Sequence, residues 1–129
     1  MPFDGPHECP FSDIDRLVAA RGKIASPNQW TKGALRRDDN RYCVVGALMN
    51  VCGSLGESRL TTAGLRLARL LADQLPKRNI ILGALLRRSP VRRLMKFNDN
   101  RWTRHSDALA LFDRAIKRLQ VTTTITARR

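Results

Sequence analysis

An apolar repeat near the carboxyl end constrains the fold more than any other feature of the chain. Over residues 106–120, apolar side chains recur at steps of three and four residues, which gathers them on one face of an α-helix. They are Ala108, Leu109, Phe112, Ala115, Ile116 and Leu119. Asp107 lies in the first turn and basic residues lie in the last, as the helix dipole favours. The pattern predicts an amphipathic helix over 106–120, followed by a frayed, threonine-rich tail at 121–129.

Four shorter segments also carry helix signals. Ser12 is a typical N-cap and begins a predicted helix that ends near Arg21. Ser89, which precedes a proline, begins another. Between them lie a very apolar segment and a segment that starts at a threonine and ends before Pro76. The predicted segments are 12–21, 42–52, 61–75 and 89–96, with a further apolar segment at 79–88. We expect a loop at 97–104.

Length and composition fit a single domain. The chain has 129 residues, of which 43% are hydrophobic and only 5% are aromatic, so the core must be built mainly from Leu, Ile, Val and Ala. The inward side chains of the first helix are expected to be Ile14, Leu17 and Val18. Two aspartates and an asparagine at 38–40 favour a turn. The expected fold is all-α: a single small helical domain over 12–120 with an irregular arm at 1–11 and one short β-hairpin near residues 30–42.

The cysteines and the amino-terminal segment indicate where such a protein resides. Cys9, Cys43 and Cys52 are odd in number and form no Cys-x-x-Cys pair. The first residues are polar and rich in proline, unlike a signal peptide, so we expect free thiols in the cytoplasm. The longest apolar run, at 80–86, is too short to cross a bilayer. We therefore expect a cytoplasmic protein with no cofactor, no metal site and no integral membrane segment.

The charge of the chain is concentrated in its second half. Of the net charge of +13, residues 77–104 carry +8, because nine bases accompany one acid, Asp99. The bases are Lys77, Arg78, Arg87, Arg88, Arg92, Arg93, Lys96, Arg101 and Arg104. Like charges crowded together are costly unless an anionic partner or counterions screen them. The pattern predicts a small non-enzymatic binding protein with an Arg-rich surface, and nucleic acid is the polyanion that it fits best.

The candidate nucleic-acid interface is drawn from this stretch. Its residues are Arg87, Arg88, Arg92, Arg93, Lys96, Arg101, Trp102 and Arg104, and Arg36, Arg37 and Arg41 would extend it if the fold brings them near. The bases would follow phosphates, and Trp102, which lies between arginines, would stack on an unpaired base. We expect the side chains of both Arg92 and Arg93 to be exposed.

Other partners also fit a basic surface. The bases could simply be solvated, or the segment 80–97 could lie on a membrane surface. Alternatively, the chain could be a phage-type interaction protein. It would then dock on an acidic or nucleic-acid-binding surface of a larger protein complex and inhibit it.

A second candidate site consists of Cys43, Asn98, Asp99 and His105. A thiol near a helix N-terminus has a lowered pKa, so Cys43 would be a nucleophile and His105 its base. Asn98 or Asp99 would orient the imidazole. The same residues also fit structural roles, with Cys43 in the core and Asn98 capping a loop. A cysteine-dependent enzyme is therefore the third hypothesis.

Three separated motifs occur in a characteristic order. The first is Trp30-x-x-Gly33-Ala34, and the second is Cys43-Val44-Val45-Gly46-Ala47-Leu48. The third is Phe97-Asn98-Asp99, five residues, His105-x-Asp107 and then Leu109-Ala110-Leu111-Phe112-Asp113-Arg114-Ala115-Ile116. Together they resemble a family of small uncharacterised bacterial and phage domains. The resemblance implies a single, mostly helical domain and implies no particular reaction.

The chain also departs from that family pattern. Arg104 stands where the pattern has a small capping residue, and Ala108 stands where it has a β-branched one. The basic run from Arg87 to Arg93 does not resemble the family. We therefore expect the positive charge to be a specialisation of this chain on a shared scaffold.

Overall fold

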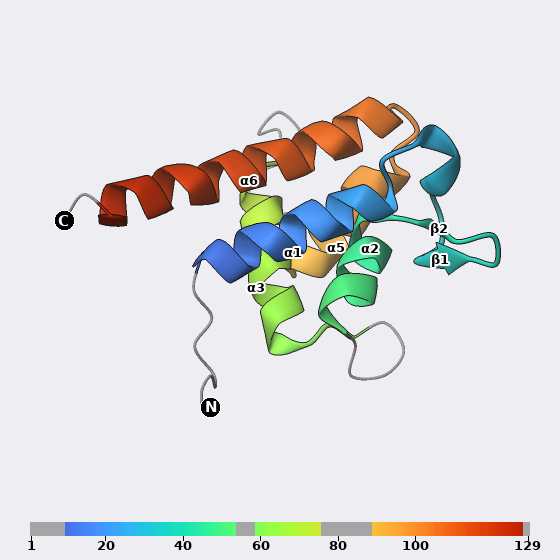
Figure 1. Cartoon of the computed structure of the whole chain (residues 1–129). Helices are drawn as coiled ribbons and strands as arrows, with labels where there is room; N and C mark the ends of the chain where they lie inside the picture. Colours follow the sequence, from blue (N-terminus) through green and yellow to red (C-terminus); the bar gives the residue numbers. More distant parts are fainter. Residues whose placement is uncertain (1–9, 54–58, 76–88, 128–129) are drawn as a thin grey trace.

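The computed structural model describes residues 10–53, 59–75 and 89–127. Within these ranges the chain forms five α-helices, one short 3-10 helix and one two-stranded antiparallel hairpin (Figure 1). In chain order the elements are α1 Pro10–Lys23, η1 Pro27–Gln29, β1 Arg36–Arg37, β2 Arg41–Tyr42, α2 Val44–Cys52, α3 Thr62–Asp73, α5 Pro90–Asp99 and α6 His105–Ala127. The prediction of a mainly helical domain with one short hairpin near 30–42 is confirmed.

The helices pack around one aliphatic core. Helix α6 runs alongside α1, α1 also packs on α2, and α3 packs on α5 (Figure 1). The largest fully buried apolar side chains are Phe112, Leu17, Ile24, Leu48, Leu67, Leu71, Leu94, Leu111, Val44 and Val45. Only one of these is aromatic, as the composition suggested. The hairpin lies at the end of the molecule where α6 begins (Figure 1).

Side-chain caps explain where helices α3 and α5 begin. The Thr61 hydroxyl accepts a hydrogen bond from the Gly64 N–H at the start of α3. The Ser89 hydroxyl does the same for the Arg92 N–H at the start of α5. These bonds satisfy N–H groups that have no partner within the helix. The predicted starts of both helices are confirmed.

A close backbone approach fixes the hairpin against α2. The Cys43 N–H donates to the Leu35 carbonyl at 3.2 Å. A methyl group on Gly46 would overlap the same carbonyl oxygen, so only glycine fits at that position. The segment that approaches α2 at Gly46 is therefore the one that enters the hairpin.

Several element boundaries differ from the predictions. The segment expected to be a loop at 97–104 begins as helix, because α5 continues to Asp99. Helix α2 starts at Val44 rather than at residue 42, because Tyr42 pairs in the hairpin. Helix α6 continues to Ala127, beyond the expected end at residue 120. Val18, expected to face inward, is 52% exposed.

Two predicted segments lie partly or wholly outside the described residues. Helix α1 begins at Pro10, inside the arm expected at 1–11, and the rest of that arm is not described. The apolar segment expected at 79–88 lies outside the described residues altogether. In the part of the chain that is described, no helix combines the length and the apolar character needed to cross a bilayer.

Candidate functional site

The outer face of α5 carries two of the predicted basic side chains. Arg92 and Lys96 are both exposed and are four residues apart, which places them on the same side of the helix. Leu94, Phe97 and Asn98 are buried on the opposite side. Arg87 and Arg88, which were also expected here, lie outside the described residues.

Arg93 does not share that outer face. Its side chain is half-buried, and its guanidinium donates to the carbonyl of Ala72 at 3.2 Å. Ala72 lies in the last turn of α3, and its carbonyl also accepts from the Leu75 N–H at 3.1 Å. The expectation that Arg93 is exposed is therefore wrong, because its charge caps a neighbouring helix.

The turn between α5 and α6 presents an exposed tryptophan. The Trp102 side chain is 76% exposed, and the guanidinium carbon of Arg101 lies 4.8 Å from its ring centroid. The backbone of the turn is fixed from within. The Trp102 N–H donates to the Asn100 side-chain oxygen at 2.8 Å, and the buried Thr103 hydroxyl donates to the Phe97 carbonyl at 2.7 Å. The indole therefore extends into solvent from an anchored turn.

Arg104 lies at the cap position of α6 without using its side chain. Its backbone N–H donates to the Asp107 carboxylate at 2.8 Å, and the Asp107 N–H donates to the Arg104 carbonyl at 2.9 Å. The Asp107 carboxylate thus accepts the backbone N–H at the cap position, from three residues further along the chain. This explains how an arginine can replace the small capping residue of the family pattern, and it leaves the Arg104 side chain exposed.

Asn98 joins three separate segments inside the protein. The side chain is fully buried, and its oxygen accepts from the Trp30 indole N–H at 2.7 Å and from the Val44 N–H at 3.2 Å. Its amide nitrogen donates to the Thr31 carbonyl at 3.0 Å and to the Asp99 carboxylate at 3.1 Å. An amide offers two donors and two acceptor positions, so all four are used.

Neighbouring contacts hold the segment before the hairpin against the end of α5. The Asp99 carboxylate accepts from the Gly33 N–H at 2.9 Å, and the Lys32 ammonium donates to the Asn100 carbonyl at 2.6 Å. Gly33 has a φ of +78°, which only glycine adopts readily. We name this cluster the Asn98 joint; its residues are Trp30, Thr31, Lys32, Gly33, Val44, Asn98, Asp99 and Asn100.

The hairpin arginines have partners within residues 31–42 and add little free charge. Arg41 is paired with Asp39 at 2.8 Å. Arg37 donates to the Thr31 hydroxyl and to the Lys32 carbonyl, whereas Arg36 donates to an asparagine and lies 5.8 Å from the Tyr42 ring centroid. Two aspartates accompany these three arginines in the sequence, which leaves the hairpin with a net charge of +1.

Cys43 and His105 each have a structural contact in this fold. Cys43 caps α2, where its sulfur accepts from the Gly46 N–H at 3.2 Å. Burial raises the pKa of the Cys43 thiol, the opposite of the shift that activates a nucleophile. The His105 Nε2 lies 2.6 Å from the Ile24 carbonyl, so that nitrogen carries the proton. Asn98 contacts Trp30, Val44 and Thr31 with its amide and does not orient the imidazole.

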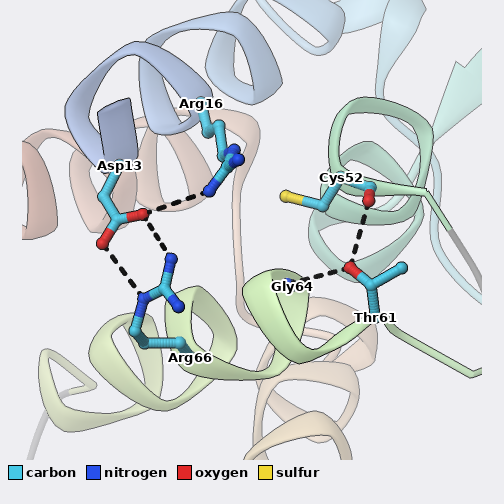
Figure 2. Close-up of polar contacts among 6 residues, drawn as sticks. All are labelled: Asp13, Arg16, Cys52, Thr61, Gly64 and Arg66. Atoms are coloured by element: carbon cyan, nitrogen blue, oxygen red, sulfur yellow. Dashed lines mark hydrogen bonds and ion pairs between the residues drawn. The ribbon is translucent and has the colours of Figure 1, made fainter. Parts of the chain in front are cut away.

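One buried carboxylate was not anticipated from the sequence. The carboxylate of Asp13, near the start of α1, accepts from the Arg66 Nη2 at 2.7 Å and from its Nε at 3.1 Å (Figure 2). The Arg16 Nη1 lies 3.4 Å from the same carboxylate. Burial raises the pKa of the Asp13 carboxyl, and the charge of Arg16 opposes that shift. The only local signal is the spacing of three residues between Asp13 and Arg16.

The half-buried Cys52 also contributes to this region. Its side chain points toward Arg16 in Figure 2, and burial raises the pKa of its thiol. The Thr61 hydroxyl donates to the Cys52 carbonyl at 3.0 Å, which connects α2 to the cap of α3. Cys43 and Cys52 are both free thiols. Among the described residues, no group of three His, Cys, Asp or Glu side chains is arranged to hold a metal ion.

Comparison with known proteins places the chain among its relatives. The model of a family of unknown function, DUF6197, matches residues 10–118. Neither a curated protein nor a solved structure matches the chain. The matched range contains all three motifs and every described element except the end of α6. The prediction of an uncharacterised family is confirmed, and the chain belongs to DUF6197, a family of unknown function.

Proposed function

We propose that this protein binds nucleic acid through the outer face of α5 and the turn that follows it. We name this region the α5–turn surface; its residues are Arg92, Lys96, Arg101, Trp102 and Arg104. One observation carries the proposal. All four cationic side chains are exposed, and no carboxylate in the described part of the chain pairs with any of them.

Many other arginines are engaged within the protein. Arg21 pairs with Asp113 at 2.7 Å, and Arg114 donates to the Gln74 carbonyl. Arg16, Arg66, Arg41 and Arg93 are also held by carboxylates or carbonyls, as described above. The α5–turn surface therefore keeps its charge available for an external anion, whereas the arginines named in this paragraph are held by groups within the fold.

The size of the surface sets the expected strength of binding. Each phosphate neutralised by a cation releases counterions and adds about 0.7–0.9 to the slope of log K against log salt. Four contacts give a slope of about 3. The affinity should then fall by roughly a hundredfold when salt rises from about 50 to about 200 mM. Binding of this kind reads the backbone and not the base sequence.

A charge-reversal experiment tests the proposal. The variant Arg92→Glu with Lys96→Glu should weaken binding to a labelled oligonucleotide at least tenfold and lower the salt slope by about 2. Its matched control is Lys117→Glu with Arg118→Glu. These two residues are also exposed, and they lie on α6 about 18 Å along the helix from its start. Both variants replace two cations by two acids, so the change in net charge is equal.

The two variants separate surface-specific binding from a general effect of charge. A much larger loss for the α5 variant supports the proposal. Equal losses would mean that net charge alone governs binding. If the wild-type protein retards neither DNA nor RNA at low salt, the function is not nucleic-acid binding. An acidic protein partner would then be the better hypothesis.

A further inference from the structure

Trp102 is unusual among the exposed apolar side chains of this protein. At 76% exposure it is the most exposed large hydrophobic side chain of the described residues, and the others, Val18, Leu65 and Val121, are aliphatic residues on helices. An indole in water has no packing role in the monomer. In the sequence it lies between two exposed arginines, Arg101 and Arg104.

The turn holds Trp102 in place without help from the indole itself. The Thr103 N–H donates to the Asn100 carbonyl at 3.0 Å, and the Asn100 side chain accepts from the Trp102 N–H. Lys32 also donates to the Asn100 carbonyl from the segment before the hairpin. Because hydrogen bonds already fix the backbone of the turn, a ligand that contacts the indole would lose little free energy to ordering of the turn.

The groups at this turn suit the two parts of a nucleotide: the indole suits the base, and the cations suit the phosphates. The guanidinium carbon of Arg101 lies over the indole ring, 4.8 Å from its centroid, and the Trp102 side chain remains 76% exposed. A flat aromatic surface stacks on a nucleobase, and neighbouring cations bind the phosphates on either side. Arg92 and Lys96 are exposed cations on the preceding helix α5.

We infer that Trp102 stacks on an unpaired base, so that the protein prefers single-stranded nucleic acid to duplex. This inference rests on the proposed nucleic-acid binding and names its substrate class. In a duplex, both faces of each base are covered by neighbouring bases, and an indole can stack only after the bases are unstacked. Stacking tolerates any base, because every base has an aromatic face. The preference is therefore for unpaired strands and not for a sequence.

Three probes of equal length test the inference. They are a single-stranded oligo-dT, an abasic deoxyribose-phosphate strand and a duplex. The wild-type protein should bind oligo-dT roughly tenfold more tightly than the abasic strand, because stacking is lost with the bases. Oligo-dT should also quench the indole fluorescence, whereas the abasic strand should not. Trp30 gives a constant background, because its indole N–H is held by Asn98.

Two variants identify the residue responsible. Trp102→Leu should bind oligo-dT and the abasic strand equally while keeping the wild-type salt slope, and Trp102→Phe should keep part of the preference. Because the side chain is exposed, both variants should melt at the wild-type temperature. The quenching measurement on the wild-type protein does not depend on either variant.

The outcomes separate this inference from the proposal beneath it. If wild type binds the abasic strand or the duplex as tightly as oligo-dT, or if Trp102→Leu keeps the preference, the inference is overturned while nucleic-acid binding stands. If wild type binds none of the three probes at low salt, both fail. An acidic protein partner would then be the better explanation of the exposed indole.

Discussion

The central side chains of two neighbouring stretches of the chain, 97–99 and 101–104, lie in opposite environments. Asn98 is fully buried and connects three segments, whereas Trp102, four residues later, extends into solvent beside two arginines. The first stretch lies in the motif on which the resemblance to the family rests, and the second contains Arg104, which departs from that pattern. The comparison teaches that Asn98 holds the scaffold together, whereas the side chains of Arg101, Trp102 and Arg104 stay exposed.

The largest expected effect comes from the Asn98 joint. Asn98→Ala leaves the Trp30 indole N–H, the Val44 N–H and the Thr31 carbonyl without a partner in the protein interior. Each buried group without a partner is costly, so the free energy of unfolding should fall by about 3 kcal/mol or more. Urea denaturation measures this fall.

Asn50→Ala is the matched control for that substitution. Asn50 is exposed and donates one 3.3 Å bond to the Tyr42 hydroxyl. Its removal should change the free energy of unfolding by no more than about 0.5 kcal/mol. If Asn98→Ala proves as mild as Asn50→Ala, the motif residues do not hold the scaffold together, and the contrast between the two stretches is lost.

Two adjacent arginines give a sharper form of the same comparison. Arg93→Ala removes the bond to the Ala72 carbonyl and should lower the free energy of unfolding by about 1 kcal/mol. Arg92→Ala removes an exposed side chain and should leave stability within about 0.5 kcal/mol while weakening nucleic-acid binding. Measuring stability and binding on both variants checks the prediction. A reversed pattern would mean that the roles of the two residues are exchanged.

The smallest expected effect is a pH dependence at Asp13. Because burial raises its pKa in the folded protein, the folded state keeps the proton to higher pH than the unfolded state. The stability that Asp13 contributes relative to Asp13→Asn should therefore be greatest at low pH. It should be lost as the pH rises from the ordinary carboxyl pKa through the raised one.

Asp39 supplies the opposite sign for comparison. A hydrogen bond from Arg41 lowers the pKa of the Asp39 carboxyl, so its contribution relative to Asp39→Asn should be lost as the pH falls. Urea denaturation across about pH 3 to 6 covers both carboxyls. If the Asp13 difference grows with rising pH, the arginines beside Asp13 outweigh the effect of burial.

Local signals predicted much of the fold. The spacing of apolar residues identified α6, and the side chains of Thr61 and Ser89 marked where α3 and α5 begin, because caps act within a few residues. Asn98 and Asp99 are residue types typical of loops, and no local pattern indicates that a buried amide finds partners 54 and 68 residues away. The extension of α5 to Asp99 was therefore missed.

The candidate site was predicted less well, for the same physical reason. Whether an arginine faces solvent depends on which carbonyl or carboxylate the fold places beside it. Arg93 faces the end of α3, 21 residues away, and Arg66 meets Asp13 across 53 residues. No local pattern contains these contacts. The exposure of the Trp102 side chain likewise depends on how hydrogen bonds hold the turn around it.

The most direct test of the central claim is a titration of the isotope-labelled protein with a short oligo-dT, followed by amide and indole chemical shifts. We predict that the shifts change for residues 92–104 and for the Trp102 indole N–H, while the Trp30 indole N–H, which donates to Asn98, stays in place. Changes confined to α3 or to the middle of α6, or no changes at low salt, would contradict the account.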